Sequence, residues 1–191
     1  MEISLFPLRT VLFPDGPLPL RIFEQRYLDM ISRCMKADVP FGVVLIRDGT
    51  ETGPVEVCDV GTLARISDWY QGSDGLLGVT AMGQQRFRIN ASRRQADGLL
   101  MGEIKLLPKE PDTALPEVYQ PLAEILEGVL DDLGRLYESL PRRYDDAGWV
   151  SYRFAEILPI PPEQKQLLLE SENPLERLAE LRQVLETVKS R

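Results

Sequence analysis

The 191-residue sequence contains no histidine. This absence excludes Ser-His-Asp triads, Cys-His pairs, HExxH zinc sites and every other mechanism in which imidazole is the general base. The only two cysteines, Cys34 and Cys58, are too few for a structural zinc site, which usually takes four Cys or His ligands. Each cysteine lies in an apolar pattern and is expected to be a buried free thiol. We therefore expect no metal site and no cofactor.

Long apolar runs and nucleotide-binding motifs are missing as well. No uninterrupted apolar segment approaches the roughly 20 residues that cross a bilayer, and the N-terminus lacks the basic and apolar regions of a secretory signal. No P-loop is present, and Gly72, Gly75 and Gly78 lack the strand-turn-helix context of a dinucleotide fingerprint. The sequence predicts a cytoplasmic protein without membrane association.

Acidic residues outnumber basic residues, and the excess lies mainly in the C-terminal half of the chain. The formal net charge is −8; residues 1–110 carry 13 basic and 14 acidic side chains, and residues 111–191 carry 9 and 16. An acidic chain is repelled by phosphate backbones and anionic lipid, so nucleic acid is an unlikely partner unless a local basic patch outweighs the net charge. Hydrophobic residues make up 43%, which is typical of a folded globular protein.

Residues 1–110 show the pattern of a β-rich domain. Short apolar or alternating runs are separated by glycine and proline, as in a barrel. One helix interrupts them, because Phe23, Tyr27, Ile31 and Cys34 recur at helical spacing, and we expect it to cap the barrel. The predicted strands cover residues 3–6, 18–21, 41–46, 55–67, 76–82, 86–91 and 99–106.

Residues 111–191 change to helical patterns. An apolar stripe from Val118 to Leu140 predicts one continuous long helix, and shorter helical segments follow. The last helix has the clearest start, because Asn173 can act as N-cap and Glu176 can reach back to the N–H of the cap residue. We expect a helical bundle here, and the chain as a whole is predicted to have an α+β fold.

Carboxylates remain as candidates for acid-base or metal chemistry. The pair Asp131-Asp132 lies on the polar side of the predicted long helix, where acidic residues are usually solvated. The pair Asp145-Asp146 lies at an expected helix N-terminus, where negative charge stabilises the helix dipole. We therefore predict no catalytic residue and no enzymatic activity.

The only basic cluster is formed by Arg86, Arg88, Arg93 and Arg94. On a strand Arg86 and Arg88 point to the same face, so the four side chains could form an anion-binding strip. The favoured interpretation is a solvated outer face of a barrel hairpin, because acidic residues are abundant elsewhere. Phe87, which alternates with the arginines, is expected to face the core.

Trp69 and Tyr70 are the other candidate residues for contact with a binding partner. They precede the glycine-rich turn at residues 72–75. Adjacent residues on a strand point to opposite faces, so at least one aromatic ring could be exposed and available to a partner. Packing of both rings in the core is the favoured interpretation.

Seven blocks of the sequence together resemble a known family. They are residues 5–16, 18–27, 41–46, 60–66, 83–89, 165–169 and 173–178. In this order they resemble the N-terminal substrate-binding domain of Lon proteases, and the similarity extends over nearly the whole chain. The resemblance implies a PUA-like β pseudo-barrel over residues 1–110 and an α-helical bundle over residues 111–191, without the Lon ATPase and protease modules.

This resemblance implies a non-catalytic polypeptide-binding module that serves in substrate recognition or as an adaptor. An unfolded or extended polypeptide would be captured in a groove or by strand addition at a sheet edge, in concert with a protease or chaperone. The candidate contacts are Phe13, Trp69 and Tyr70. The alternative is an RNA-binding PUA-like module that uses the Arg86–Arg94 strip, which salt-dependent RNA binding would reveal.

Overall fold

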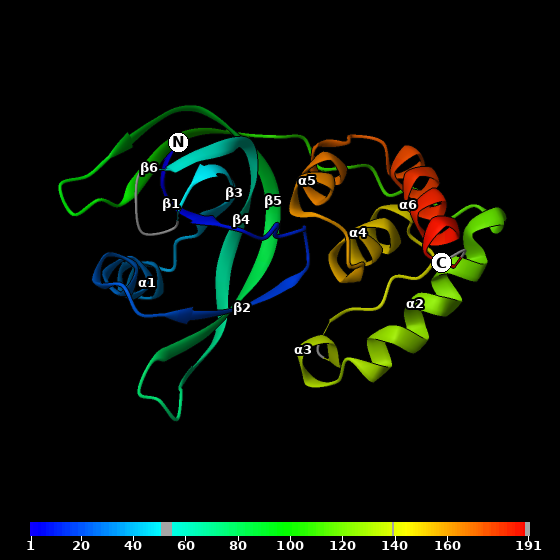
Figure 1. Ribbon diagram of the computed structural model, residues 1–191, viewed down its shortest axis with the longest axis horizontal. Coiled ribbons are helices and arrows are strands. Elements are labelled where there is room, and N and C mark those ends of the chain that lie inside the picture. The colour runs from blue at the N-terminus through cyan, green and yellow to red at the C-terminus, as the bar shows by residue number, and fades with distance from the viewer. Residues whose placement is uncertain (51–54, 139, 190–191) are drawn as a thin grey trace. The chain divides into compact units, whose positions relative to one another are not determined.

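The computed structural model describes residues 1–50, 55–138 and 140–189, and the chain divides into two compact units, Met1–Pro108 and Lys109–Arg191. The first unit contains a sheet with one helix, and the second is helical (Figure 1). The elements of the first unit are β1 (Glu2–Leu8), β2 (Pro17–Ile22), α1 (Gln25–Ala37), β3 (Phe41–Gly49), β4 (Val55–Gln71), β5 (Leu77–Arg94) and β6 (Leu100–Leu106).

Five of the six described strands form a closed ring. β1 pairs in parallel with β3 and antiparallel with β6, and antiparallel pairs join β3 to β4, β4 to β5 and β5 to β6. β2 lies outside this ring and pairs with the first half of β5. The first half of β5 and the second half of β4 therefore extend beyond the ring as a hairpin, to which β2 is added (Figure 1).

Two hydrophobic cores stabilise the first unit. One includes Leu5 and Phe87, together with apolar residues of the other ring strands. The other lies between the sheet and α1, where the ring of Phe6 stacks on that of Tyr27 with 4.1 Å between centroids. Leu5 and Phe6 are neighbours on one strand and point to opposite faces, so β1 contributes to both cores.

Glycine allows the ring strands to approach each other closely. A Cβ on Gly61 would collide with the carbonyl oxygen of Val43 and lie 2.8 Å from the ring of Phe87. A Cβ on Gly42 would lie 2.7 Å from the same ring. The core around Phe87 therefore has no room for one more methyl group at either position.

Two expectations for the first unit were wrong. The strands expected at 76–82 and 86–91 are parts of the single long strand β5, which begins at Leu77, because Gly83 is not a turn. Its N–H donates to the carbonyl of Gly16 and its carbonyl accepts from the N–H of Asp15, which brings residues 13–16 against β5. Phe23 lies outside α1 with 61% of its surface exposed, so it is not part of the buried face of that helix.

Among the described residues of the second unit the regular elements are helices, and one isolated β-bridge accompanies them. None of the described helices is long and apolar enough to span a bilayer. The elements are η1 (Glu117–Tyr119), α2 (Gln120–Asp132), α3 (Arg135–Glu138), α4 (Ala147–Ile157), α5 (Pro162–Glu170) and α6 (Pro174–Lys189).

The predicted long helix from Val118 to Leu140 is interrupted. Gly134 takes a left-handed conformation with φ of +67°, which ends α2 and lets a short separate helix, α3, follow. The expected stripe is also only partly buried, since Val118, Ile125 and Leu133 are exposed. The buried face of α2 is formed instead by Leu122, Ala123, Leu126 and Leu130.

The predicted helix starts at Asp146 and Asn173 are confirmed. The carboxylate of Asp146 accepts from the backbone N–H groups of the first turn of α4, at 2.8 and 3.1 Å. The side-chain oxygen of Asn173 accepts from the N–H of Leu175 at 3.0 Å. Glu176 reaches back to the side-chain amide of Asn173 at 3.1 Å, so it supports the cap through the side chain.

A fully buried guanidinium group ties the helical unit together. Arg177 on α6 donates to both carboxylate oxygens of Glu110, at 3.0 and 2.6 Å, and to the hydroxyl of Ser151 on α4 at 2.8 Å. It also donates to the carbonyl of Ser171, and it lies 3.8 Å from the centroid of the Tyr152 ring. The start of the unit is thereby bound to α4 and α6.

We expect Gly61→Ala to lower the free energy of unfolding by about 1–3 kcal/mol, because the added methyl group collides with a main-chain carbonyl that cannot rotate away. Gly128→Ala is the control, since no atom lies within 4 Å of a Cβ at that position in α2. It should be neutral or stabilise by up to about 1 kcal/mol. Chemical denaturation followed by circular dichroism measures both. Equal stability of the two variants would contradict the close approach of Gly61 to the carbonyl of Val43.

We expect Glu110→Ala to destabilise the helical unit by about 3–5 kcal/mol, because it leaves the guanidinium of Arg177 buried without its carboxylate. Asp131→Ala removes an exposed carboxylate 3.4 Å from Arg142 and should cost less than about 1 kcal/mol. Thermal and denaturant unfolding of both variants makes the comparison. A loss below about 1 kcal/mol in Glu110→Ala would show that the buried pair is not essential.

Candidate functional site

Strand β4 is longer than its neighbour β3. The two strands pair only up to the partners Phe41 and Ala64, whereas β4 continues to Gln71. Residues 65–71 pair with β5 on one side. Their other side is the one on which β3 pairs with β4 before Arg65, and no described strand pairs with residues 65–71 there. We call this side of residues 65–71 the open edge. Main-chain groups that lack a partner strand on this side are a template for another strand.

The other free edge of this part of the sheet, on β2, is chemically different. β2 pairs with β5 on one side and carries Pro17 and Pro19, which lack an N–H group. Proline two residues apart on an edge strand blocks strand addition. The open edge contains no proline, so it is the better template of the two.

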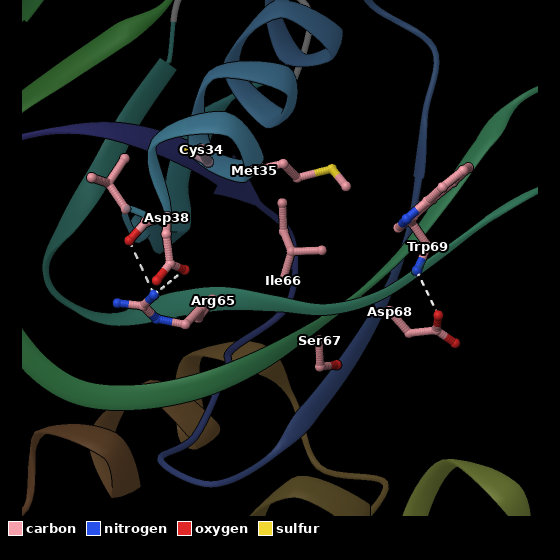
Figure 2. Close-up of a pocket in the computed structure, with 9 residues that line it drawn as sticks. Cys34, Met35, Asp38, Arg65, Ile66, Ser67, Asp68 and Trp69 are labelled. Atoms are coloured by element: carbon pink, nitrogen blue, oxygen red, sulfur yellow. Dashed lines mark hydrogen bonds and ion pairs between the residues drawn. The ribbon is translucent and has the colours of Figure 1, made fainter.

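A groove lies between the C-terminal end of α1 and the open edge. It encloses about 300 Å³. Figure 2 shows its side chains, with Met35 on the helix facing Ile66 and Trp69 on β4. The lining residues are Cys34, Met35, Asp38, Val39, Arg65, Ile66, Ser67, Asp68 and Trp69.

A β-bulge gives the groove its apolar wall. The register passes from Ile66 opposite Ala81 to Asp68 opposite Thr80, so Ser67 is the extra residue. Without the extra residue Ile66 and Trp69 would point to opposite faces, since they are three positions apart. With it, both lie on the groove side (Figure 2).

Polar groups accompany this wall. At one end Nη1 of Arg65 donates to the carbonyl of Asp38 at 3.0 Å and forms an ion pair with its carboxylate. Asp38 ends α1 in a left-handed conformation, with φ of +51°. Near the other end the N–H of Trp69 donates to the carboxylate of Asp68 at 2.8 Å. The groove is therefore apolar in its middle and closed by an ion pair at the Arg65 end.

The chemistry of the groove suits binding. Its thiol belongs to Cys34, which is buried, and burial raises the pKa of this thiol. A protonated thiol is a weak nucleophile. No group of three or more His, Cys, Asp or Glu side chains able to hold a metal ion is found in the described residues. The groove thus offers apolar and polar contacts to a ligand.

The structure distinguishes the three predicted polypeptide contacts. Trp69 and Tyr70 are both exposed, at 59% and 50%, so the favoured expectation that both rings pack in the core is wrong. Trp69 lines the groove, whereas the ring of Tyr70 covers Gly78 on the neighbouring strand. Phe13 is fully buried and is not available at the surface.

The predicted basic strip is not assembled as a single exposed cluster. Arg86 is buried, with 4% of its surface exposed, although Arg88, Arg93 and Arg94 are exposed. Arg93 is paired with Glu2 at 2.9 Å. Arg86 therefore cannot contribute to an anion-binding surface in this structure.

A buried acid-base cluster in the helical unit was not predicted. The hydroxyl of Tyr137 donates to Glu156 at 2.6 Å, Arg153 pairs with the same carboxylate at 3.0 Å, and Lys165 donates to the Glu156 carbonyl at 2.6 Å. Burial raises the pKa of Glu156, and burial next to Glu156 raises the pKa of Tyr137. Because these groups bind each other, we interpret the cluster as a structural link between α3, α4 and α5.

These features define a mixed α+β protein that presents an open strand edge beside a groove. Its sequence matches the profile of the ATP-dependent protease La (LON) substrate-binding domain over residues 2–187. The chain therefore belongs to the Lon substrate-binding domain family.

Relatives agree with this assignment. The crystal structure of a Lon N-terminal domain protein from Xanthomonas campestris is 36% identical, with a TM-score of 0.78 and coverage of 95% of this chain and 96% of that chain. The Lon protease of Cytophaga hutchinsonii is 23% identical over 96% of this chain, and protein cereblon of Danio rerio is 29% identical over 52%. The chain spans 24% and 23% of these two proteins, respectively.

Proposed function

We propose that this protein binds extended polypeptide segments at the open edge of β4 and receives their apolar side chains in the groove. The observation that carries this proposal is that β4 continues beyond β3 directly beside the groove. Membership of a substrate-binding domain family supports it.

Strand addition explains how a single site accepts many sequences. Main-chain hydrogen bonds to residues 65–71 give affinity without demanding particular side chains, and alternate side chains of the bound segment point toward the groove. Met35, 42% exposed, has a flexible thioether chain that adapts to different shapes. Ile66 and the exposed ring of Trp69 add apolar area that becomes buried on binding.

The bound segment leaves the site chemically unchanged under this proposal. The protonated Cys34 thiol and the lack of a metal cluster in the described residues support a binding role. We assign the strand unit to the PUA-like pseudo-barrels because of its closed five-strand ring. We further propose that the protein works in the cytoplasm and delivers segments to a protease or chaperone.

Trp69→Ala should weaken peptide binding about five- to twentyfold, because the indole ring loses its contact in the groove. The probe is a seven-residue peptide of alternating valine and threonine, titrated by calorimetry against the full chain. Tyr70→Ala is the matched control, since this neighbouring aromatic ring is similarly exposed but covers Gly78. Equal losses in both variants, or none in either, would argue against the groove as the binding site.

Backbone methylation of the peptide should show whether it binds as an added strand. Only alternate N–H groups of an edge-bound strand face the sheet, so methylating one alternate set should abolish binding and methylating the other should have little effect. Two peptides with the same sequence and the same number of methyl groups provide the comparison by calorimetry. If both methylated peptides bind as well as the parent, strand addition is ruled out.

A further inference from the structure

The position available to an added strand is in line with β3. β3 pairs with one side of β4 up to Ala64. An added strand would pair with the open edge, which is the continuation of that same side. β3 occupies this line from Phe41 onward, and the residues that connect α1 to β3 lead into it. An added strand in this line must therefore end, or turn away, where β3 begins.

Strand direction decides which end of the polypeptide arrives there. β3 runs antiparallel to β4, so a segment added antiparallel to β4 runs in the same direction as β3. Its carboxyl end then meets the start of β3, beside Arg65. Antiparallel pairs are slightly more stable per residue than parallel pairs, and β4 forms antiparallel pairs with both of its present neighbours.

Arg65 has the donors that a carboxylate requires. Nη1 of its guanidinium bonds to Asp38, and no partner of Nε or Nη2 is found among the described residues. The side chain is 40% exposed. Nε and Nη2 present two parallel N–H groups, the arrangement that holds a carboxylate through two hydrogen bonds. Asp38 offsets part of the positive charge, so recognition depends on these paired donors.

Building on the proposed function, we propose that the groove selects the free carboxyl terminus of an extended polypeptide. The last residues pair with the open edge, an apolar side chain enters the groove against Ile66 and Trp69, and the terminal carboxylate is held by Arg65. Segments in the middle of a chain bind more weakly, because they must turn away where β3 begins and leave Arg65 without a carboxylate.

Three forms of one peptide test this selectivity. The seven-residue valine-threonine peptide is prepared with both ends free, with an amidated carboxyl end and with an acetylated amino end, and each is titrated against the full chain by calorimetry. Loss of hydrogen bonds to a charged group should weaken the amidated peptide about tenfold. Acetylation should change affinity less than about twofold. An amidated peptide that binds as tightly as the free acid would overturn the proposal.

The variant Arg65→Gln tests whether Arg65 is responsible for the preference for a free carboxyl end. In this variant the free and amidated peptides should bind equally, at the affinity of the amidated peptide for the natural protein. Arg93→Gln is the matched control, because Arg93 is also an exposed strand arginine paired with a carboxylate, and it should retain the tenfold preference. Thermal unfolding verifies that both variants are folded. If Arg65→Gln retained the preference, Arg65 would not be the carboxylate-binding residue.

The outcomes separate this inference from the proposed function. Binding of both peptide forms with equal affinity, reduced by Trp69→Ala, would leave the proposed function intact and remove the terminus selectivity. No binding of any form would remove both.

Discussion

The hydrogen-bonded pairing of β3 with β4 ends at Phe41 and Ala64, and beyond that point β4 is held to the sheet by β5. This end point is fixed by packing, since Phe41 and Ala64 are both fully buried in the core beneath α1. The ring next to it is equally constrained, because Gly61 leaves no space beside Phe87. A rigid ring thus supports a hairpin with an unfilled side, and α1 provides the opposite wall of the groove.

The two units use buried polar groups differently. In the described part of the strand unit, apolar residues fill the two cores and Thr62 and Arg86 are the buried polar residues. The helical unit instead encloses the guanidinium groups of Arg153 and Arg177, each paired with a carboxylate. Such pairs add little net stability over a hydrophobic substitute, but they penalise any arrangement in which one partner is missing. They therefore specify how short helices pack.

Local signals were predictable from the sequence, and long-range register was not. The start of the last helix at Asn173 was predictable because it depends on residues within four positions of each other. Lon family membership was predictable because matching blocks occur along the chain. The end of α2 depends on the backbone conformation of Gly134. Trp69 was found as a candidate, but Arg65 and Met35 were missed. Their proximity depends on where β3 ends and on the bulge at Ser67, neither of which leaves a periodic signal.

The carboxylate of Asp68 has one more consequence. It accepts the N–H of Trp69. Two copies meeting through the open edge would bring their Asp68 charges toward each other, which disfavours self-association and the edge-to-edge pairing that seeds aggregates. Under the proposed function, a bound segment that used the Trp69 N–H would compete with this internal acceptor, which would speed its release.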